Sequence, residues 1–382
     1  MTGYAAEMEL LLCCCAPQGR ERYARRISEL LDGTLDWSRL LALAESQGVS
    51  PLLYWVLKDV RPEAIPGELT RRFQDNTLNS VHLTAELLRV VDLLSSEGIS
   101  VLPFKGPTLA IAAYGNLALR QFVDIDLLVP GKDAQRALGV LTRSGYSLNL
   151  RLSPRRQKAY LRAYDEFVLS RDDHGCLVEL HWGVTRPYFS VPLNSDDFFA
   201  RATCVRLSQK KIPSLSREDL ISVLCLHGAK HCWSHLSHVA DLAWLLNAGE
   251  VCWKDILAGA CKLGALRMIL LGVGLAHRLF EVRLPAEVEG AMVADRAVEG
   301  LVSTAIVAML TDRIPEGAIL KAARFHMRAR ERWQDRMRYM FRLATTPSIE
   351  DWESADLPAS LSFLYFFLRF PRLLRKYSQR AP

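Results

Sequence analysis

The stretch VLPFKGPTLAIAAYGNLALRQFVDIDLLVP, from Val101 to Pro130, decides the expected fold. Val101–Phe104 is a short apolar run that ends at a Lys-Gly-Pro turn, and Phe122–Val129 is a second run whose residues suit a buried strand. Between the two runs, the segment Thr108–Tyr114 is predicted to be helical. The sequence therefore indicates two buried strands that are joined by a turn and a short helix.

Two carboxylates lie one residue apart in the second of these strands, at Asp124 and Asp126. Because side chains alternate between the faces of a strand, both carboxylates are expected on one exposed face, with Val123, Ile125 and Leu127 pointing into the core. Like charges at this spacing repel unless a cation lies between them, and Mg²⁺ prefers oxygen ligands. The pair therefore points to metal-bound phosphate chemistry.

The order of these features resembles the DNA polymerase β-like nucleotidyltransferase superfamily, in which a glycine turn, a helix and an Asp-apolar-Asp strand follow one another. The segment KGPTLAIAAYGNLALRQFVDIDLLV is more similar still to a bacterial family described as uncharacterised nucleotidyltransferases. WSRLLALA, which starts at Trp37, and GVSPLL, which starts at Gly48, resemble the N-terminal region of the same family. Pro107 follows Gly106 where the superfamily usually has Gly or Ser, and 17 residues separate Gly106 from Asp124.

The segment CLVELHW, which starts at Cys176, is predicted to be a further strand. Alternation places Glu179 and His181 on one face, and Val178 and Leu180 on the other. In the superfamily, a third carboxylate on a neighbouring strand completes the metal site and helps to activate the attacking hydroxyl, and the resemblance implies that Glu179 is this acid. The alternative is that Glu179 is the solvent-facing residue of an edge strand.

Four histidines, at positions 227, 231, 235 and 238, fall in the segment Asp219–Leu246. If the segment is one helix that begins at the capping residue Ser216, the four rings share a sector of about 80°. Three interpretations remain open: a zinc site that lacks the HExxH pattern, a structural polar seam, and a helix that faces a nucleotide cleft. The resemblance favours the third, with Lys230 as a phosphate contact and with His227, His231 and Asp241 as further nucleotide-binding candidates.

Composition narrows the class of protein. A chain of 382 residues, 50% hydrophobic and 24% charged, is typical of two or three compact units. A net charge of +6 is compatible with anionic ligands but low for a dedicated nucleic-acid-binding protein. Nine cysteines without a CxxC pair predict reduced thiols in a cytoplasmic protein with no disulfide partner. No apolar run reaches the roughly 18 residues that span a bilayer, so no membrane partner is expected.

Helical patterns flank the central region. The longest, Glu68–Glu97, has apolar residues at helical spacing, and arginines at 324, 328, 332 and 336 favour a solvated helix face over a polyanion-binding ridge. A short helix is predicted at Leu361–Tyr377. The apolar stripe of Glu68–Glu97 comprises Leu78, Leu83, Leu87, Val90, Val91 and Leu94, and the four preceding helices are expected at Glu7–Cys15, Arg20–Leu31, Trp37–Gln47 and Leu52–Val60.

Together these patterns predict an α+β protein: a small mixed β-sheet nucleotidyltransferase core at residues 99–213, between an N-terminal helical region (1–98) and a C-terminal helical bundle (214–382). The resemblance implies transfer of a nucleoside monophosphate from an NTP to an acceptor, with Mg²⁺ or Mn²⁺ as the cofactor. Asp124, Asp126 and Glu179 would hold the metal, and Lys105, Gly106 and Arg120 would contact the nucleotide.

Several points stay open. Arg120 has the alternative of a salt bridge to Asp124 or Asp126, and Asp165 or Glu166 could replace Glu179 as the third acid. The acceptor is a small molecule, a peptide, a protein or RNA. Two other classes remain: a non-catalytic nucleotide-binding or assembly protein on the same fold, and a basic nucleic-acid-binding helical protein.

Overall fold

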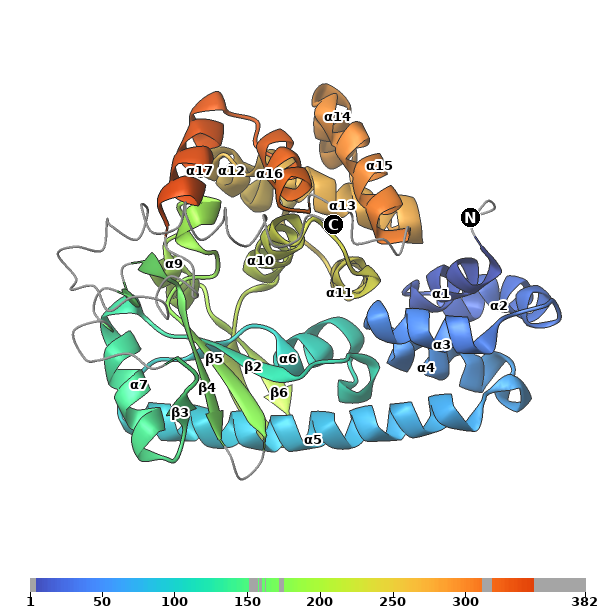
Figure 1. The fold of residues 1–382 in the computed structure, drawn as a ribbon, viewed down its shortest axis with the longest axis horizontal. Helices are drawn as coiled ribbons and strands as arrows, with labels where there is room; N and C mark the ends of the chain where they lie inside the picture. Colours follow the sequence, from blue (N-terminus) through green and yellow to red (C-terminus); the bar gives the residue numbers. More distant parts are fainter. Residues whose placement is uncertain are drawn as a thin grey trace, which may run out of the picture.

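The computed structural model describes residues 5–150, 157, 160–161, 163–171, 175–310 and 318–346. These residues form an α+β fold, as predicted (Figure 1). The strands of the main sheet come from the middle of the chain, and helices precede and follow them in the sequence. The helix expected at Leu361–Tyr377 lies outside the described residues. Within the described part of the chain, no helix has both the length and the apolar character that crossing a bilayer requires.

Five helices open the chain. The last of them, α5, has 30 residues and therefore spans about 45 Å at 1.5 Å per residue, beneath both the sheet and the N-terminal helices in Figure 1. Their bounds are α1 (Ala6–Cys15), α2 (Gly19–Leu31), α3 (Trp37–Ser46), α4 (Ser50–Val60) and α5 (Gly67–Ser96), with a 3-10 turn at Pro62–Ala64.

Helix α5 joins two hydrophobic cores. Leu69, near its start, is buried with α1–α4, whereas the apolar stripe that runs from Leu83 to Leu94 is buried against the sheet. Leu78 lies between these two packed parts and is 70% exposed. The prediction that Leu78 belongs to the buried stripe is therefore wrong, because the middle of a helix this long has no core on that side.

The main sheet has five strands in the spatial order β1-β2-β5-β4-β3. Strands β2 and β5 pair in parallel and the other neighbours pair antiparallel, so the sheet is mixed, as predicted. The strands are β1 (Leu102–Pro103), β2 (Asp124–Leu128), β3 (Ser147–Leu148), β4 (Glu166–Arg171) and β5 (Cys176–His181).

Shorter elements complete this region. Between β1 and β2 lie α6 (Gly106–Leu109), a π-helical turn (Ala110–Tyr114) and a 3-10 turn (Leu117–Leu119); α7 (Ala134–Arg143) follows a 3-10 turn at Gly131–Asp133. After β5 come a 3-10 turn (Pro187–Phe189), α9 (Ser195–Ala200) and the antiparallel hairpin of β6 (Thr203–Leu207) and β7 (Lys210–Ser214).

The predicted alternation of side chains along β2 is confirmed for the residues that face the core. Ile125 and Leu127 are buried, as predicted, but Val123 is 65% exposed. The prediction for Val123 is wrong because β2 begins only at Asp124, so the alternation does not reach back to it. The expected exposed face is also wrong for Asp126, which is 3% exposed and covered by neighbouring side chains.

The turn between β1 and α6 depends on Gly106. Its φ is +50°, a conformation that favours glycine, and a Cβ there would lie 3.4 Å from the carbonyl oxygen of Asp124. Pro107 follows in the first turn of α6, where its missing N–H would have no helical partner. The turn therefore places the chain directly against β2.

The C-terminal part of the described chain is helical. Helix α13 is buried along most of its length and packs against α10, α11, α12 and α15. Residues of α1 and α4 belong to the same hydrophobic core as these helices. The elements are α10 (Arg217–Lys230), α11 (Leu236–Asn247), α12 (Trp253–Leu263), α13 (Leu266–Phe280), α14 (Ala286–Ala294), α15 (Ala297–Leu310), α16 (Ala318–Arg328) and α17 (Trp333–Thr345).

The single helix predicted at Asp219–Leu246 is wrong, because the segment forms α10 and α11 with a turn between them. Cys232 and Trp233 both have φ of +53° in this turn. Trp233 is fully buried against Gly228 and Gly272. A Cβ at Gly228 would lie 2.6 Å from the indole, and a Cβ at Gly272 would lie 2.8 Å from it. Burial of the Trp233 ring therefore ends the helix. The expected cap is present, since Ser216 Oγ accepts from the Asp219 amide at 3.2 Å.

The arginines at 324, 328, 332 and 336, which were predicted on one helix, are divided between α16, α17 and the segment that joins them. Arg324 and Arg328 lie on α16, whereas Arg336 lies on α17, which begins after Arg332. Arg332 donates to the Cys261 carbonyl, and Arg336 Nε donates to the Arg330 carbonyl at 2.9 Å. The prediction of one continuous helical face is therefore wrong, although Arg324, Arg328 and Arg332 are exposed, as the solvated interpretation predicted.

The close approach of Trp233 to α10 gives a stability prediction. We expect Gly228→Ala to lower the free energy of unfolding by about 1–3 kcal/mol, since the new methyl group would overlap the buried indole. Gly259→Ala on α12 is the matched control, because a Cβ there meets nothing within 4 Å and alanine favours a helix by up to ~1 kcal/mol. Urea denaturation measures the free energy of unfolding of both variants. Equal stability of the two would contradict the close packing of Trp233 against Gly228.

Candidate active site

A pocket of about 480 Å³ lies between the polar face of β2 and β5 and the helices α10 and α11. Nine of the ten sequence candidates line it. Gly106 does not; it forms the turn behind Lys105. The nine are Lys105, Arg120, Asp124, Asp126, Glu179, His227, Lys230, His231 and Asp241.

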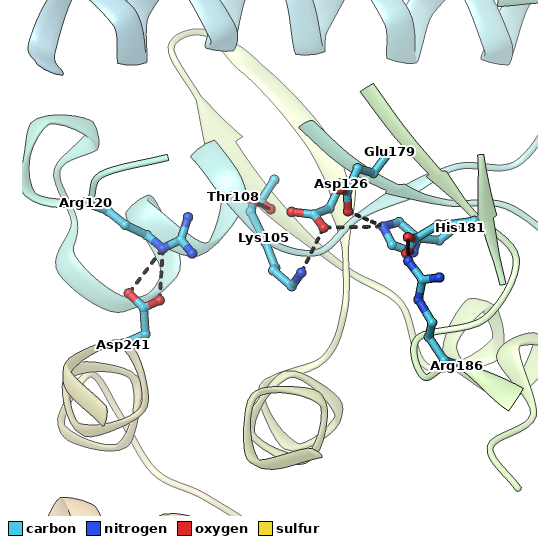
Figure 2. A network of polar contacts seen from close by, with 9 residues as sticks. Lys105, Thr108, Arg120, Asp126, Glu179, His181, Arg186 and Asp241 are labelled. Carbon is cyan, nitrogen blue, oxygen red and sulfur yellow. Dashed lines mark hydrogen bonds and ion pairs between the residues drawn. The ribbon is translucent and has the colours of Figure 1, made fainter. Parts of the chain in front are cut away.

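The acidic wall of the pocket is formed by the two parallel strands. Their register places Asp126 directly beside Glu179, and Asp124 comes two residues earlier on β2. Lys105 Nζ donates to Asp126 Oδ1 at 2.9 Å (Figure 2). His181 Nε2 lies 3.3 Å from Asp126 Oδ1 and 3.2 Å from Glu179 Oε2. Two cationic side chains thus lie against Asp126, and one of them also lies against Glu179.

These contacts set the charges of the wall. Burial alone would raise the pKa of Asp126, but Lys105 and His181 outweigh it and hold this pKa well below its usual range. Contact with His181 lowers the pKa of Glu179. Burial opposes the charge of His181, yet Asp126 and Glu179 raise its pKa to about 9. Burial and the charges of Asp126 and Glu179 raise the pKa of Asp124 to about 6. Asp126 and Glu179 are therefore ionised at neutral pH.

His181 is the residue to which the sequence assigned no role. It follows Glu179 by two positions on the same strand face, so the alternation that selected Glu179 would also have selected it. Within the described residues, two groups of three side chains bring possible metal-ligand atoms within 4.8 Å of one another: Asp126, Glu179 and His181, and Asp165, Glu166 and His181. His181 belongs to both, and Asp124 to neither.

Other side chains also pack around His181. Glu166 Oε2 on β4 lies 3.5 Å from His181 Nδ1, and Arg186 forms an ion pair with Glu166. The Phe104 ring meets the imidazole edge-on, with centroids 5.2 Å apart. From the sequence, Glu166 was predicted only as an alternative to Glu179 as the third acid. No sequence pattern indicated a role for Arg186.

The opposite wall carries the four histidines. Although these residues lie on two helices and the turn between them, their rings converge. The ring centroids of His227 and His231 are 4.5 Å apart, and the His238 centroid is 5.3 Å from those of His227 and His235. Burial lowers the pKa of His227 and His238 well below the usual value, so these rings are neutral. The histidines are not among the groups of close metal-ligand atoms that the described residues form.

Cations of the pocket differ in their partners. Lys105 pairs with Asp126, and Arg186 with Glu166. Lys230 projects from the last turn of α10 and forms no ion pair within 4.0 Å in the part of the chain that the structure describes; burial lowers its pKa. Lys230 is therefore free to meet an anionic ligand.

Arg120 pairs with Asp241 and not with the acids of β2. Its Nε donates to both carboxylate oxygens of Asp241, at 3.0 and 3.1 Å (Figure 2). Tyr114 Oη also donates to Asp241 Oδ1, at 2.8 Å. The alternative of a salt bridge to Asp124 or Asp126 is wrong. The pair joins the segment before β2 to α11 and so holds the two walls of the pocket together.

A family model described as uncharacterised nucleotidyltransferase matches residues 33–281. The chain belongs to this family. The match includes every residue placed in the pocket, and it supports nucleotidyl transfer as the general activity. No curated protein and no solved structure matches the chain.

In this member of the family, the pair between Arg120 and Asp241 gives a second prediction. Both side chains are at most 15% exposed, so removal of either leaves a buried charge without its partner. We expect Arg120→Met and Asp241→Leu each to lower the free energy of unfolding by about 3–5 kcal/mol, and the double variant to cost clearly less than the sum.

A double-mutant cycle by urea denaturation measures this coupling. The control is the exposed pair of Arg278 and Glu299, for which we expect at most about 1 kcal/mol. Additive costs for Arg120 and Asp241 would show that the two walls are not joined through this pair.

Proposed function

We propose that the protein transfers a nucleoside monophosphate from an NTP to an acceptor and releases pyrophosphate, with Mg²⁺ or Mn²⁺ as the cofactor. The observation that carries the proposal is the placement of Asp126 and Glu179 side by side on two parallel strands, at the wall of a pocket with cationic groups. Membership of the nucleotidyltransferase family supports the reaction class. The acceptor is a small molecule, a peptide, a protein or RNA.

Asp124, Asp126 and Glu179 would hold the metal. Carboxylate oxygens are the ligands that Mg²⁺ prefers, and the ionised state of Asp126 already depends on nearby positive charge. Asp126 and Glu179 bring possible ligand atoms within 4.8 Å of one another, so this pair fits a divalent cation, whereas Asp124 would have to move closer to join it. When bound, the cation offsets charge on the phosphates and on the leaving pyrophosphate.

Lys230 is the main phosphate contact in this proposal, because it faces the pocket without an ion-pair partner among the described residues. Its ammonium group suits a triphosphate as a point charge. Lys105 and Arg120 are further phosphate contacts, although each already pairs with a carboxylate. Gly106 would position Lys105. His227, His231 and Asp241 complete the nucleotide-binding candidates on the helical wall.

Glu179 differs from Asp126 in its access to the pocket. The Glu179 side chain is 27% exposed, whereas that of Asp126 is 2% exposed. An acceptor can therefore approach Glu179 more easily. In the proposed step the acceptor oxygen bonds to the α-phosphorus, its proton passes to Glu179, and the bond from the α-phosphorus to the bridging oxygen breaks to release pyrophosphate.

The test uses the position of a radioactive label. The protein is incubated with Mg²⁺, cell extract and each NTP in turn, labelled at the α- or the γ-phosphate. We expect a labelled acceptor from the α-label only, and labelled pyrophosphate from the γ-label. Glu179→Gln keeps the shape of the side chain and should slow labelling by ~10²–10⁴-fold, since it removes a general base.

The control is NTP–Mg²⁺ affinity, measured by calorimetry on the same preparations. Glu179→Gln should change this affinity far less than it slows labelling, because Asp124 and Asp126 would still hold the ion and a base acts mainly in the transition state. Transfer of the γ-label would indicate a phosphotransferase instead. NTP binding without any labelled product would favour the non-catalytic nucleotide-binding protein.

A further inference from the structure

His181 lies at the end of β5 with acids on both sides of its ring. Nε2 faces Asp126 and Glu179, at 3.3 and 3.2 Å, and Nδ1 faces Glu166 at 3.5 Å. The residue is 5% exposed, yet neither ring nitrogen completes a hydrogen bond of normal geometry to the described residues. A buried imidazole with two uncommitted nitrogens is costly unless something else satisfies them.

The side of the ring that faces Glu166 matches a recurrent arrangement. A metal-binding histidine almost always donates its second ring N–H to a carboxylate, which fixes the tautomer and the ring orientation. Glu166 is in position to accept from Nδ1, and the Arg186 ion pair holds Glu166 in place (Figure 2 shows Arg186 beside His181). The Phe104 ring packs against the imidazole with the two ring planes 75° apart and so restricts its rotation. With Nδ1 occupied in this way, Nε2 faces Asp126 and Glu179 and would become a ligand when a bound cation displaces its proton.

We propose that His181 is a nitrogen ligand of the metal, together with Asp126 and Glu179, and that it makes this site prefer Mn²⁺ to Mg²⁺. The inference rests on the metal site of the proposed function and deepens it by naming the ion. Mg²⁺ favours sites made only of oxygen donors, whereas an imidazole ligand favours the first-row transition ions. Glu166 is the positioning residue, because it acts on the metal only through the ring.

A rival role for His181 is that of a positive counter-ion to Asp126 and Glu179. The two roles predict opposite effects of removing the ring. Loss of a ligand would weaken Mn²⁺ binding and leave Mg²⁺ binding nearly unchanged. Loss of a counter-ion would strengthen the binding of both cations, because one positive charge next to the acids would be removed.

The experiment titrates the full chain with Mn²⁺ alone and follows free Mn²⁺ by electron paramagnetic resonance, with Mg²⁺ affinity obtained by competition. We expect the wild-type protein to bind Mn²⁺ at least tenfold more tightly than Mg²⁺. His181→Gln should weaken Mn²⁺ binding by about tenfold or more and Mg²⁺ binding by less than threefold. His235→Gln is the matched control, since His235 lines the same pocket but belongs to neither group of close ligand atoms.

Glu166→Gln is the second variant and decides the matter if His181→Gln does not fold. It keeps the shape of the side chain and should weaken Mn²⁺ binding by roughly 10–100-fold through the ring. The inference is overturned if the wild-type protein binds no Mn²⁺, or if the variants that fold leave Mn²⁺ affinity unchanged or raise it. Transfer of the α-label under any of these outcomes would leave the proposed function intact.

Discussion

The ion pair between Lys105 and Asp126 is the interaction on which the site depends. A carboxylate as deeply buried as Asp126 is stable in its charged form only if cations and hydrogen bonds compensate the lost hydration. Lys105 supplies one of these cations, and it can do so because Gly106 allows the tight turn against β2. The glycine turn therefore serves to bring an ammonium group to the buried acid, in addition to any contact with a phosphate.

The second wall of the pocket is held by contacts between distant parts of the chain. Burial of Trp233 ends α10, and the Gln47 side chain then accepts the Leu236 amide at 2.8 Å where α11 begins. Arg120 and Asp241 join α11 to the segment before β2. The end of α3 thus contacts the start of α11, and the family match, which begins at residue 33, includes this contact.

Local pattern was enough to predict β2, β5 and the polar face that carries Asp126 and Glu179, because alternation is a property of a single strand. It could not reveal the parallel register that places these two residues side by side, since that register is set by pairing across the sheet. The convergence of the histidines was predicted from a continuous helix and is present for a different reason, the turn at Trp233. Partners such as Asp241 for Arg120, 121 positions away, have no signal in a single sequence. The division at residues 99 and 214 and the cytoplasmic location stay predictions.

The most direct test of this account is a crystal structure with Mn²⁺ and an NTP analogue whose α–β bridging oxygen is replaced by an imido group. The analogue cannot release pyrophosphate, and the anomalous scattering of manganese marks the ion without assumptions about its ligands. The account predicts an anomalous peak bonded to Asp126 and Glu179, with the phosphates between that ion and Lys230. A peak with no bond to Asp126, or a nucleotide bound outside this pocket, would contradict it.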